Sequence, residues 1–199
     1  MRVVSIVGSY RKGGIVDSAV DEILEAAREE GAEVRKVYLI DTRIEFCTNC
    51  RLCTQRAGAA RGVCPIDDEM RRILDEIEEA DAVVLASPMN FWSVTAVMKR
   101  FVERLVCYAY WPWGTAAPKP RSTRRDKRAV LVTASAAPAI VGRLATPIVK
   151  TLRRVAELLG SKTIGVLYIG LSAGKEHQDI GERARHKARL LGKRLAQGN

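Results

Sequence analysis

Four of the five cysteines of this 199-residue chain lie within one short segment. Cys47, Cys50 and Cys53 follow C-x2-C-x2-C spacing, and Cys64 comes after ten intervening residues. Three thiolates on one turn with a fourth from a returning loop are typical of [4Fe-4S] ligation. Zinc also accepts four thiolates, although its sites usually combine two separated C-x2-C pairs. The segment therefore predicts a [4Fe-4S] cluster, with zinc, or with free, buried or redox-active thiols, as the alternatives.

Two features bear on the redox state of these thiols. The opening residues MRVVSIVG are too short for a signal peptide or a membrane span, so we expect a soluble, cytoplasmic protein with no membrane partner. Thiols stay reduced in that compartment, and a chain of this length can build a core without disulfides. Metal binding or redox chemistry is therefore favoured over structural disulfides.

A second group of candidate residues forms the segment GSYRKGGIVDS, residues 8–18. Its glycines let backbone amides approach a ligand, Ser9 supplies a hydroxyl, and Arg11 and Lys12 supply positive charge just ahead of a predicted helix. Such a loop favours a phosphate group. It matches neither the Walker A pattern nor G-x-G-x-x-G, and the alternative is a glycine-rich turn with surface charges.

A third group lies in the segment SPMNFWSVTAVMKRF, residues 87–101. Pro88 should direct the chain across a sheet edge, where the next four residues offer aromatic surface and an amide. This combination suits a flat heteroaromatic ring, whereas Phe91 and Trp92 alone would be read as core or interface residues. Together, the two loops predict a mononucleotide site, with phosphate at residues 9–16 and the ring at residues 88–92.

The elements that position these loops alternate along the chain. Residues 2–7, 82–86, 128–134 and 162–169 are apolar runs typical of strands covered on both faces, and residues 32–40 resemble an edge strand. The order predicts an α/β, flavodoxin-like three-layer sandwich with a five-stranded parallel sheet in order 2-1-3-4-5. Its topological switch lies between strands 1 and 3, so a ligand should bind at the loops after Val7 and Ala86.

Apolar residues at helical spacing predict helices between these strands, and the tail from about Lys175 predicts a final one. Asp67, Asp68 and Glu69 should cap the second helix, and Gly31 and Gly160 occupy C-cap positions. His177 and His186 lie in or near a basic helix and are expected to face solvent.

We expect a single domain over residues 1–199, with a Cys-rich insertion at 43–66 and a long aromatic and basic loop at 108–127. A loop of that length often serves as a lid or an oligomer contact. We expect a homodimer or homotetramer that buries Trp111 and Trp113 against a neighbour and covers the exposed edge of the strand at 162–169.

The formal charge of +10 is concentrated in residues 119–128 and 183–194. We interpret it as a solvated face and expect no nucleic-acid partner, because no nucleic-acid-binding motif accompanies it. Around the cysteines, Arg43, Arg51, Arg56 and Arg61 would stabilise a negatively charged cluster, or else form a solvated loop surface. Cys107, on an apolar helix, is expected in the core.

The motifs GSYRKGG, C-x2-C-x2-C…C, DDEM and SPMNFWSVTAVMKRFVERL resemble those of the NADPH-dependent FMN reductase superfamily, and most closely the iron-sulfur flavoproteins. The resemblance covers the chain and implies a flavodoxin-like fold that binds FMN. Relatives often carry Asn and Thr where this chain has Ile15 and Val16, so its phosphate site should depend more on backbone amides. Relatives also usually have a shorter gap before the last cysteine. The residues implied to bind FMN are Ser9, Arg11, Gly13, Gly14, Ile15 and Val16 at the phosphate, Pro88, Met89, Asn90, Phe91 and Trp92 at the ring, and Thr133, Ala134 and Ser135 on the far side.

The resemblance also implies an FMN-dependent oxidoreductase with NAD(P)H as co-substrate. Electrons would pass to a [4Fe-4S] cluster, a quinone, ferredoxin or another carrier, and cations near the site would favour the anionic reduced flavin. Because the cofactor performs the chemistry, no acid-base residue is assigned. The alternatives are a non-enzymatic electron-carrier or thiol redox-sensing flavoprotein, and a zinc-stapled nucleic-acid binder.

Overall fold

The computed structural model describes residues 1–174 and 178–197. Five parallel strands form the central sheet in the order β2-β1-β3-β8-β9, which confirms the predicted flavodoxin-like order. In chain order these strands are β1 (Arg2–Val7), β2 (Glu33–Tyr38), β3 (Ala82–Ala86), β8 (Lys127–Ala134) and β9 (Ser161–Ile169).

Burial explains why the strands adopt this order. All five residues of β3 are buried, as the continuous apolar run AVVLA predicts for a central strand covered on both faces. Strand β2 instead alternates exposed and partly buried residues at the sheet edge. The opposite edge is β9, the predicted edge strand.

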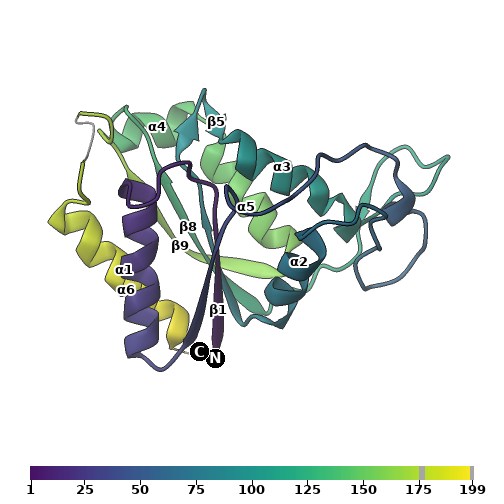
Figure 1. Cartoon of the computed structure of the whole chain (residues 1–199), viewed down its shortest axis with the longest axis horizontal. Coiled ribbons are helices and arrows are strands. Elements are labelled where there is room, and N and C mark those ends of the chain that lie inside the picture. Colours follow the sequence, from purple (N-terminus) through teal and green to yellow (C-terminus); the bar gives the residue numbers. More distant parts are fainter. Residues whose placement is uncertain (175–177, 198–199) are drawn as a thin grey trace.

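The helices cover both faces of the sheet, so the predicted three-layer sandwich is confirmed (Figure 1). One face carries α1 (Ile15–Glu29) and α6 (Glu182–Ala196), and the other carries α2 (Met70–Glu79), α3 (Ala96–Arg104) and α5 (Ile148–Leu158). A short helix that the sequence did not predict, α4 (Ala139–Ala145), lies beyond the end of β8.

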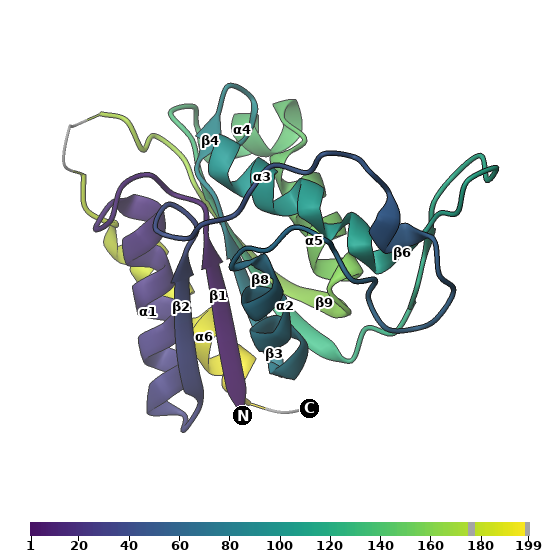
Figure 2. The same cartoon turned by 45° about the vertical axis from the view of Figure 1, so that its right-hand side comes forward.

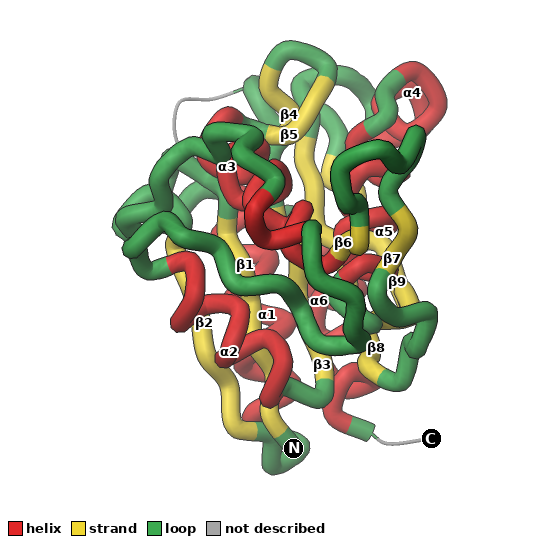
Figure 3. The backbone as a smooth tube through the Cα atoms, turned by 90° about the vertical axis from the view of Figure 1, so that its right-hand side faces the viewer, coloured by secondary structure: helices red, strands yellow, loops and turns green. Residues whose placement is uncertain are grey.

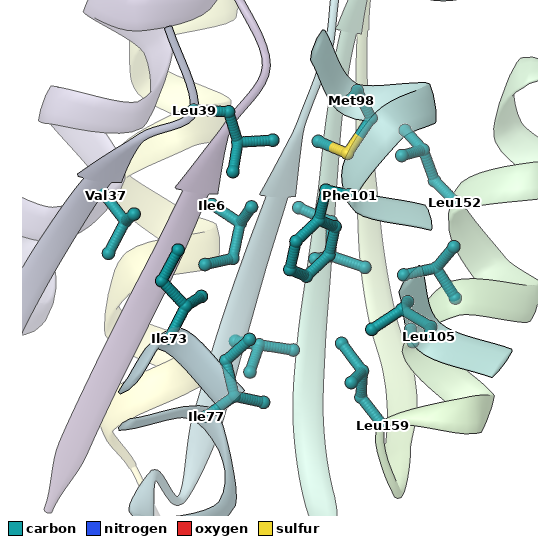
Figure 4. Close-up of a cluster of buried hydrophobic side chains, with 14 of the residues drawn as sticks. Ile6, Val37, Leu39, Ile73, Ile77, Met98, Phe101, Leu105, Leu152 and Leu159 are labelled. Carbon is teal, nitrogen blue, oxygen red and sulfur yellow. The ribbon is translucent and has the colours of Figure 1, made fainter. Parts of the chain in front are cut away.

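The side chains of α2, α3 and α5 meet the sheet in a continuous apolar layer (Figure 4). Met98 and Phe101 of α3 are fully buried, and Ile6 of β1 lies opposite them. Burying each such side chain contributes roughly 1.5–3 kcal/mol. This layer fixes α3 against the sheet, and both ends of α3 matter for the candidate sites described below.

The helix ends follow the predicted signals in most places. Gly31 and Gly160 have positive φ angles of 85° and 74°, as C-cap glycines require. The Asp68 carboxylate accepts the amide of Met70 at 3.1 Å, at the start of α2. The predicted helix start at Lys175 lies outside the described residues, as does His177, and α6 begins at Glu182.

Two insertions extend from the sandwich on the side of α2, α3 and α5 (Figures 2 and 3). The Cys-rich segment, residues 43–66, contains one 3₁₀ turn, Leu52–Thr54, and the long loop, residues 108–127, contains a small hairpin of β6 (Ala109–Tyr110) and β7 (Lys119–Pro120). They bond to one another: the Trp111 amide donates to the Thr54 carbonyl at 2.9 Å, and Arg121 donates to the Cys53 carbonyl at 3.0 Å.

The basic face of α6 is largely matched by acidic residues of α1. Arg189 binds Glu29 at 2.6 Å and approaches Glu22 at 3.5 Å. These ion pairs give one of the two basic segments a partner within the chain. Within the described residues, no helix has the length and apolar character needed to cross a membrane.

Candidate functional site

A cavity of about 860 Å³ opens at the carboxyl ends of the central strands, where the sheet order predicts a ligand. Its volume lies within the usual range of ligand sites, roughly 300–1,000 Å³. The wall contains residues that follow β1, β3, β8 and β9: Ser9, Tyr10, Arg11, Lys12, Gly13, Gly14, Ile15, Val16, Pro88, Asn90, Ala134, Ser172, Ala173, Gln178 and Asp179.

The loops after β1 and β3 are tied together at the base of this cavity, which we call the flavin cavity after the ligand expected from the sequence. The Thr95 hydroxyl donates to the Gly8 carbonyl at 2.6 Å and caps α3 by accepting the Met98 amide at 3.2 Å. A Cβ atom at Gly8 would lie 2.7 Å from the Cβ of Met98, so only glycine allows α3 to approach this closely. The base of the cavity is thus a fixed junction between β1, β3 and α3.

The candidate phosphate loop, residues 8–18, is shaped largely by its own hydrogen bonds. The Ser9 hydroxyl accepts the Arg11 amide and donates to the Arg11 carbonyl, both at 3.1 Å. The Gly13 amide, at φ 72°, donates to Asp17 at 2.7 Å. No side chain caps α1 at Gly14, and Gly14, Ile15 and Val16 line the cavity, so the first turn of this helix is in a position to donate amides to an anion.

A buried carboxylate supports this loop from below. Asp17, which is 2% exposed, also accepts the Tyr38 hydroxyl at 3.2 Å and binds the Lys36 ammonium at 2.5 Å. Burial opposes the charge on Lys36, but its hydrogen bonds to Asp17 and Asp21 leave its pKa raised. Lys36 therefore neutralises a negative charge that would otherwise repel an anion bound in the loop.

The segment after β3 forms a tight hairpin of β4 (Met89–Asn90) and β5 (Ser93–Val94). Pro88 and Asn90 line the flavin cavity, but Met89 packs on the core, and neither Phe91 nor Trp92 is part of the cavity wall. Phe91 and Trp92 occupy the turn with positive φ angles of 45° and 67°, and they are 96% and 62% exposed. The structure therefore does not bring these two rings into the cavity wall, and their contact with a flavin ring stays a prediction.

On the far side of the cavity, only part of the expected segment contributes. Ala134 lines the wall, whereas Thr133 points to the opposite sheet face and Ser135 is buried, with its hydroxyl bonded to the Ala137 carbonyl at 2.9 Å. Residues after β9, including Ser172 and Gln178, complete the wall and were missed from the sequence. The rule that ligands bind at carboxyl strand ends could have identified them.

The four clustered cysteines line one small cavity, which we call the cysteine cavity. Cys53 is buried, Cys47 and Cys64 are half-buried, and Cys50 is exposed. Burial, together with the neighbouring Cys64, Cys50 and Cys47 thiols, raises the pKa of Cys53. The fold therefore brings Cys64 back to the C-x2-C-x2-C turn across the ten-residue gap.

One charged residue that hydrogen-bonds to these thiols was not singled out from the sequence. Arg104, the last residue of α3, is 3% exposed and donates to the Cys64 sulfur at 3.5 Å. It forms an ion pair at 2.5 Å with Asp68, whose side chain is fully buried. The available signal was an arginine in the apolar stripe that includes Val97 and Phe101, because a buried charge needs a partner.

The four arginines expected around the cysteines have other partners or are exposed. Arg51, which lines the cysteine cavity, stacks on the rings of Trp111 and Trp113 at 3.7 and 4.2 Å. Arg61 pairs with Asp75 and Glu78. Arg43 donates to the Asp67 carbonyl at 3.0 Å and Arg56 is exposed. Trp111 thus packs within its own chain, while Trp113 remains 65% exposed.

Cys107 lies in the core, as expected, at 2% exposure. Burial raises the pKa of its thiol to about 12, with the nearby Cys53 thiol acting in the same direction. This fifth cysteine is not part of the cavity wall that the other four share.

The side chains that line the cysteine cavity are chemically suited to an iron-sulfur cluster, but the cavity is too small for one in this structure. Four thiols and a buried cation face one cavity, which suits a negatively charged tetrathiolate group. The free volume is about 10 Å³, close to that of one water molecule. Among residues 1–174 and 178–197, no group of three or more His, Cys, Asp or Glu side chains converges tightly enough to hold a single metal ion. A cluster would therefore require this cavity to be wider than it is here.

Several curated relatives are named as iron-sulfur flavoproteins. An iron-sulfur flavoprotein of Archaeoglobus fulgidus is 38% identical over 56% of this chain and 49% of its own length. An iron-sulfur flavoprotein of Methanocaldococcus jannaschii is 36% identical over 52% of this chain and 51% of its own length. The chain thus matches these relatives over about half of their length.

Solved structures support the fold. An FMN-dependent NADH-azoreductase from Bacillus anthracis str. Ames Ancestor, in complex with FMN, has a TM-score of 0.72 at 13% identity, covering 98% of this chain and 99% of that one. At this identity the similarity concerns the fold alone. The model of the NADPH-dependent FMN reductase family matches residues 1–174, most of the chain. The chain therefore belongs to the NADPH-dependent FMN reductase family.

Proposed function

We propose that the chain is an FMN-dependent NAD(P)H oxidoreductase that moves electrons from a reduced nicotinamide to a small or protein acceptor. The observation that carries the proposal is the flavin cavity, which combines an anion-binding helix terminus with a large opening at the topological switch of the sheet. Membership of the FMN reductase family supports the same assignment.

The residues of the cavity have distinct parts in this proposal. The first amides of α1 would hold the phosphate, with Arg11 and Lys12 supplying positive charge, while Lys36 cancels the charge of Asp17. Pro88, Asn90 and Ala134, which line the same cavity, would hold the ring. FMN, when bound, supplies the hydride chemistry, and the protein orients it and tunes its charge. The cations favour the anionic reduced form of the ring.

The finer part of the proposal concerns the four cysteines, which we assign as ligands of a [4Fe-4S] cluster: Cys47, Cys50, Cys53 and Cys64. Two observations support it, namely the shared cavity and the Arg104 donor at Cys64. The relatives named as iron-sulfur flavoproteins support the same reading. The cluster would pass electrons to a quinone, ferredoxin or another carrier.

A second candidate, a thiol redox sensor, is favoured by the small free volume beside the thiols, about 10 Å³. The exposed Cys50 and the half-buried Cys64 would then form a disulfide or mixed disulfide in response to an oxidant. In that case the flavin would still bind, and the thiols would change oxidation state without iron.

Absorption spectroscopy on the purified chain separates these functions. The protein is reconstituted anaerobically with FMN, ferrous iron and sulfide, desalted, and assayed for bound flavin, iron and sulfide. We expect flavin bands, a broad shoulder at longer wavelengths, about four irons per chain, and bleaching of the flavin by NADPH or NADH.

Three results would contradict parts of the proposal. A colourless product after exposure to FMN would contradict the flavin assignment. Flavin bands without iron would contradict the cluster and favour the thiol sensor, and a flavin that neither nicotinamide reduces would contradict the NAD(P)H oxidoreductase activity.

A further inference from the structure

Arg104 is a buried cation at the end of α3 whose hydrogen bonds can be followed one by one. Its Nη1 donates to the Glu45 carbonyl at 2.8 Å and to the Asp68 carboxylate at 2.5 Å. Its Nη2 donates to the second Asp68 oxygen at 3.2 Å and to the Cys64 sulfur at 3.5 Å. Its Nε is buried and has no partner among the described residues.

This arrangement goes beyond what is needed to neutralise Asp68. The ion pair is buried on both sides, with side chains 2% and 0% exposed. A buried ion pair of this kind often adds little stability compared with an apolar pair of similar volume. Here Asp68 and Glu45 fix the guanidinium so that one N–H points at a sulfur atom and another N–H is left open.

The position of Arg104 on its helix also favours a negatively charged neighbour. The C-terminal end of α3 carries the negative end of the helix dipole, which repels thiolates placed near it. The cysteine cavity lies at this end, since Arg104 and Val106 both line it. A cation in the last turn offsets that repulsion and presents positive charge to the sulfur ligands.

We propose that Arg104 is a positioning residue for the electron-transfer site, donating an N–H···S hydrogen bond to the cluster ligand Cys64 and raising the reduction potential of the cluster. The inference rests on the proposed cluster. A reduced cluster carries one more negative charge than an oxidised cluster, so a buried cationic donor stabilises the reduced state. The open Nε–H is available to a second sulfur atom of the cluster.

The experiment compares reduction potentials in three variants that differ in charge and geometry. The double variant Arg104→Met, Asp68→Asn removes the hydrogen bond to sulfur while leaving the net charge unchanged and no buried charge unpaired. Arg104→Lys keeps the charge but lacks the planar fork that binds Asp68 and Cys64 together. Arg51→Gln is the matched control. It removes a positive charge that lines the same cavity, but the guanidinium of Arg51 stacks on tryptophan rings.

Each protein is reconstituted anaerobically, its iron and sulfide are counted, and its cluster is titrated under EPR detection. We expect the double variant to lower the reduction potential of the cluster by at least about 59 mV. For a one-electron couple this corresponds to a tenfold change in the ratio of oxidised to reduced cluster. Arg104→Lys should lower the reduction potential by a smaller amount. Arg51→Gln should change the ratio of oxidised to reduced cluster by less than about threefold.

Two outcomes overturn the inference and can be told apart. If the wild-type chain loads a cluster and neither Arg104 variant shifts the potential more than Arg51→Gln, the role of Arg104 is wrong and the cluster stands. If the wild-type chain takes up no iron and sulfide, the cluster assignment fails and this inference fails with it. Should the double variant not fold, Arg104→Lys decides alone against the same control.

Discussion

The flavin cavity and the cysteine cavity are built in opposite ways. The flavin cavity is open, with a volume of about 860 Å³, and its anion-binding wall consists mainly of backbone amides in a loop between a strand and a helix. The cysteine cavity holds about 10 Å³ and is enclosed by the Cys-rich segment, by Arg104 at the end of α3 and by Val106 in the turn after it. The first has room for a ligand as it stands, whereas the second has room for no more than about one water molecule.

The difference follows from where each site lies in the fold. The flavin cavity lies at the switch point between β1 and β3, so the sheet order alone creates it. The cysteine cavity depends on contacts between segments that are far apart in sequence, such as Arg104 with Cys64 and Arg121 with Cys53. Disturbing the first should therefore weaken ligand binding, and disturbing the second should weaken the fold of the insertions.

Helix α3 joins the two sites. Thr95, at its N-terminus, binds the loop below the flavin cavity, and Arg104, at its C-terminus, binds a cysteine. The nine helical residues between these points extend over about 13 Å. One rigid element, held by the buried Met98 and Phe101, therefore sets the spacing between the sites.

The largest expected difference separates Cys107 from the four clustered cysteines. Its pKa of about 12 leaves only about one thiolate in ten thousand at pH 8, roughly a thousandfold fewer than an ordinary thiol. Iodoacetamide labelling of the native, cofactor-free protein, followed by peptide mass spectrometry, should modify Cys50 quickly and leave Cys107 unmodified. Labelling of Cys107 at a rate comparable to Cys50 would show that the core around the cysteine cavity is open.

The next largest effect is on stability. Asp68→Ala leaves the buried Arg104 without its ion-pair partner and should lower the free energy of unfolding by about 3–5 kcal/mol in urea denaturation. Asp126→Ala, which removes an exposed ion pair with Arg124, is the control and should change it by less than about 1 kcal/mol. Equal effects of the two substitutions would mean that the Asp68 pair does not hold the insertion.

The same pair gives a pH dependence. Burial opposes ionisation of Asp68, but the hydrogen bonds from Arg104 and from the Glu45 and Met70 amides keep its pKa below the usual value. Its stabilisation is therefore present at neutral pH and is lost as the pH falls through this lowered pKa. The stability difference between the wild type and Asp68→Ala should shrink in acid.

A smaller effect concerns the flavin cavity. Lys36→Met leaves the charge of Asp17 uncancelled below the phosphate loop and should raise the dissociation constant of FMN about tenfold, or about 1.4 kcal/mol. Riboflavin, which lacks the phosphate, is the control ligand and should bind about equally to both proteins. Adding Asp17→Asn should recover part of the FMN affinity, as measured by flavin fluorescence quenching. Unchanged FMN binding in Lys36→Met would contradict the electrostatic role of this pair.

The smallest expected effect is at the hairpin turn. Trp92 is 62% exposed and lies outside the cavity wall, so Trp92→Ala should change the free energy of unfolding by no more than about 0.5 kcal/mol. If the flavin ring binds against Asn90, in the same hairpin, Trp92→Ala should disturb it only indirectly. The affinity for FMN should then fall by less than about threefold. A large loss of FMN affinity would show that the turn rearranges over the bound ring.

The sheet order and the position of the loop before α1 at the cavity could be predicted because they depend on local patterns. Apolar runs and glycines appear directly in the sequence, and parallel topology then places the loops after Val7 and Ala86 side by side. The exposed turn at Phe91 and Trp92 could not be predicted, because two consecutive positive φ angles at non-glycine residues are a local exception. Arg104 was missed for another reason: its partners Cys64 and Asp68 are 40 and 36 residues away in sequence.

The central claim is that the loop before α1 binds the phosphate of FMN, and a titration of the wild-type chain with FMN and riboflavin tests it most directly. Fluorescence quenching should show saturable binding of one FMN per chain, with riboflavin at least about tenfold weaker, and rising salt should weaken FMN more than riboflavin. Equal affinity for the two flavins, or no binding of FMN, would contradict the account.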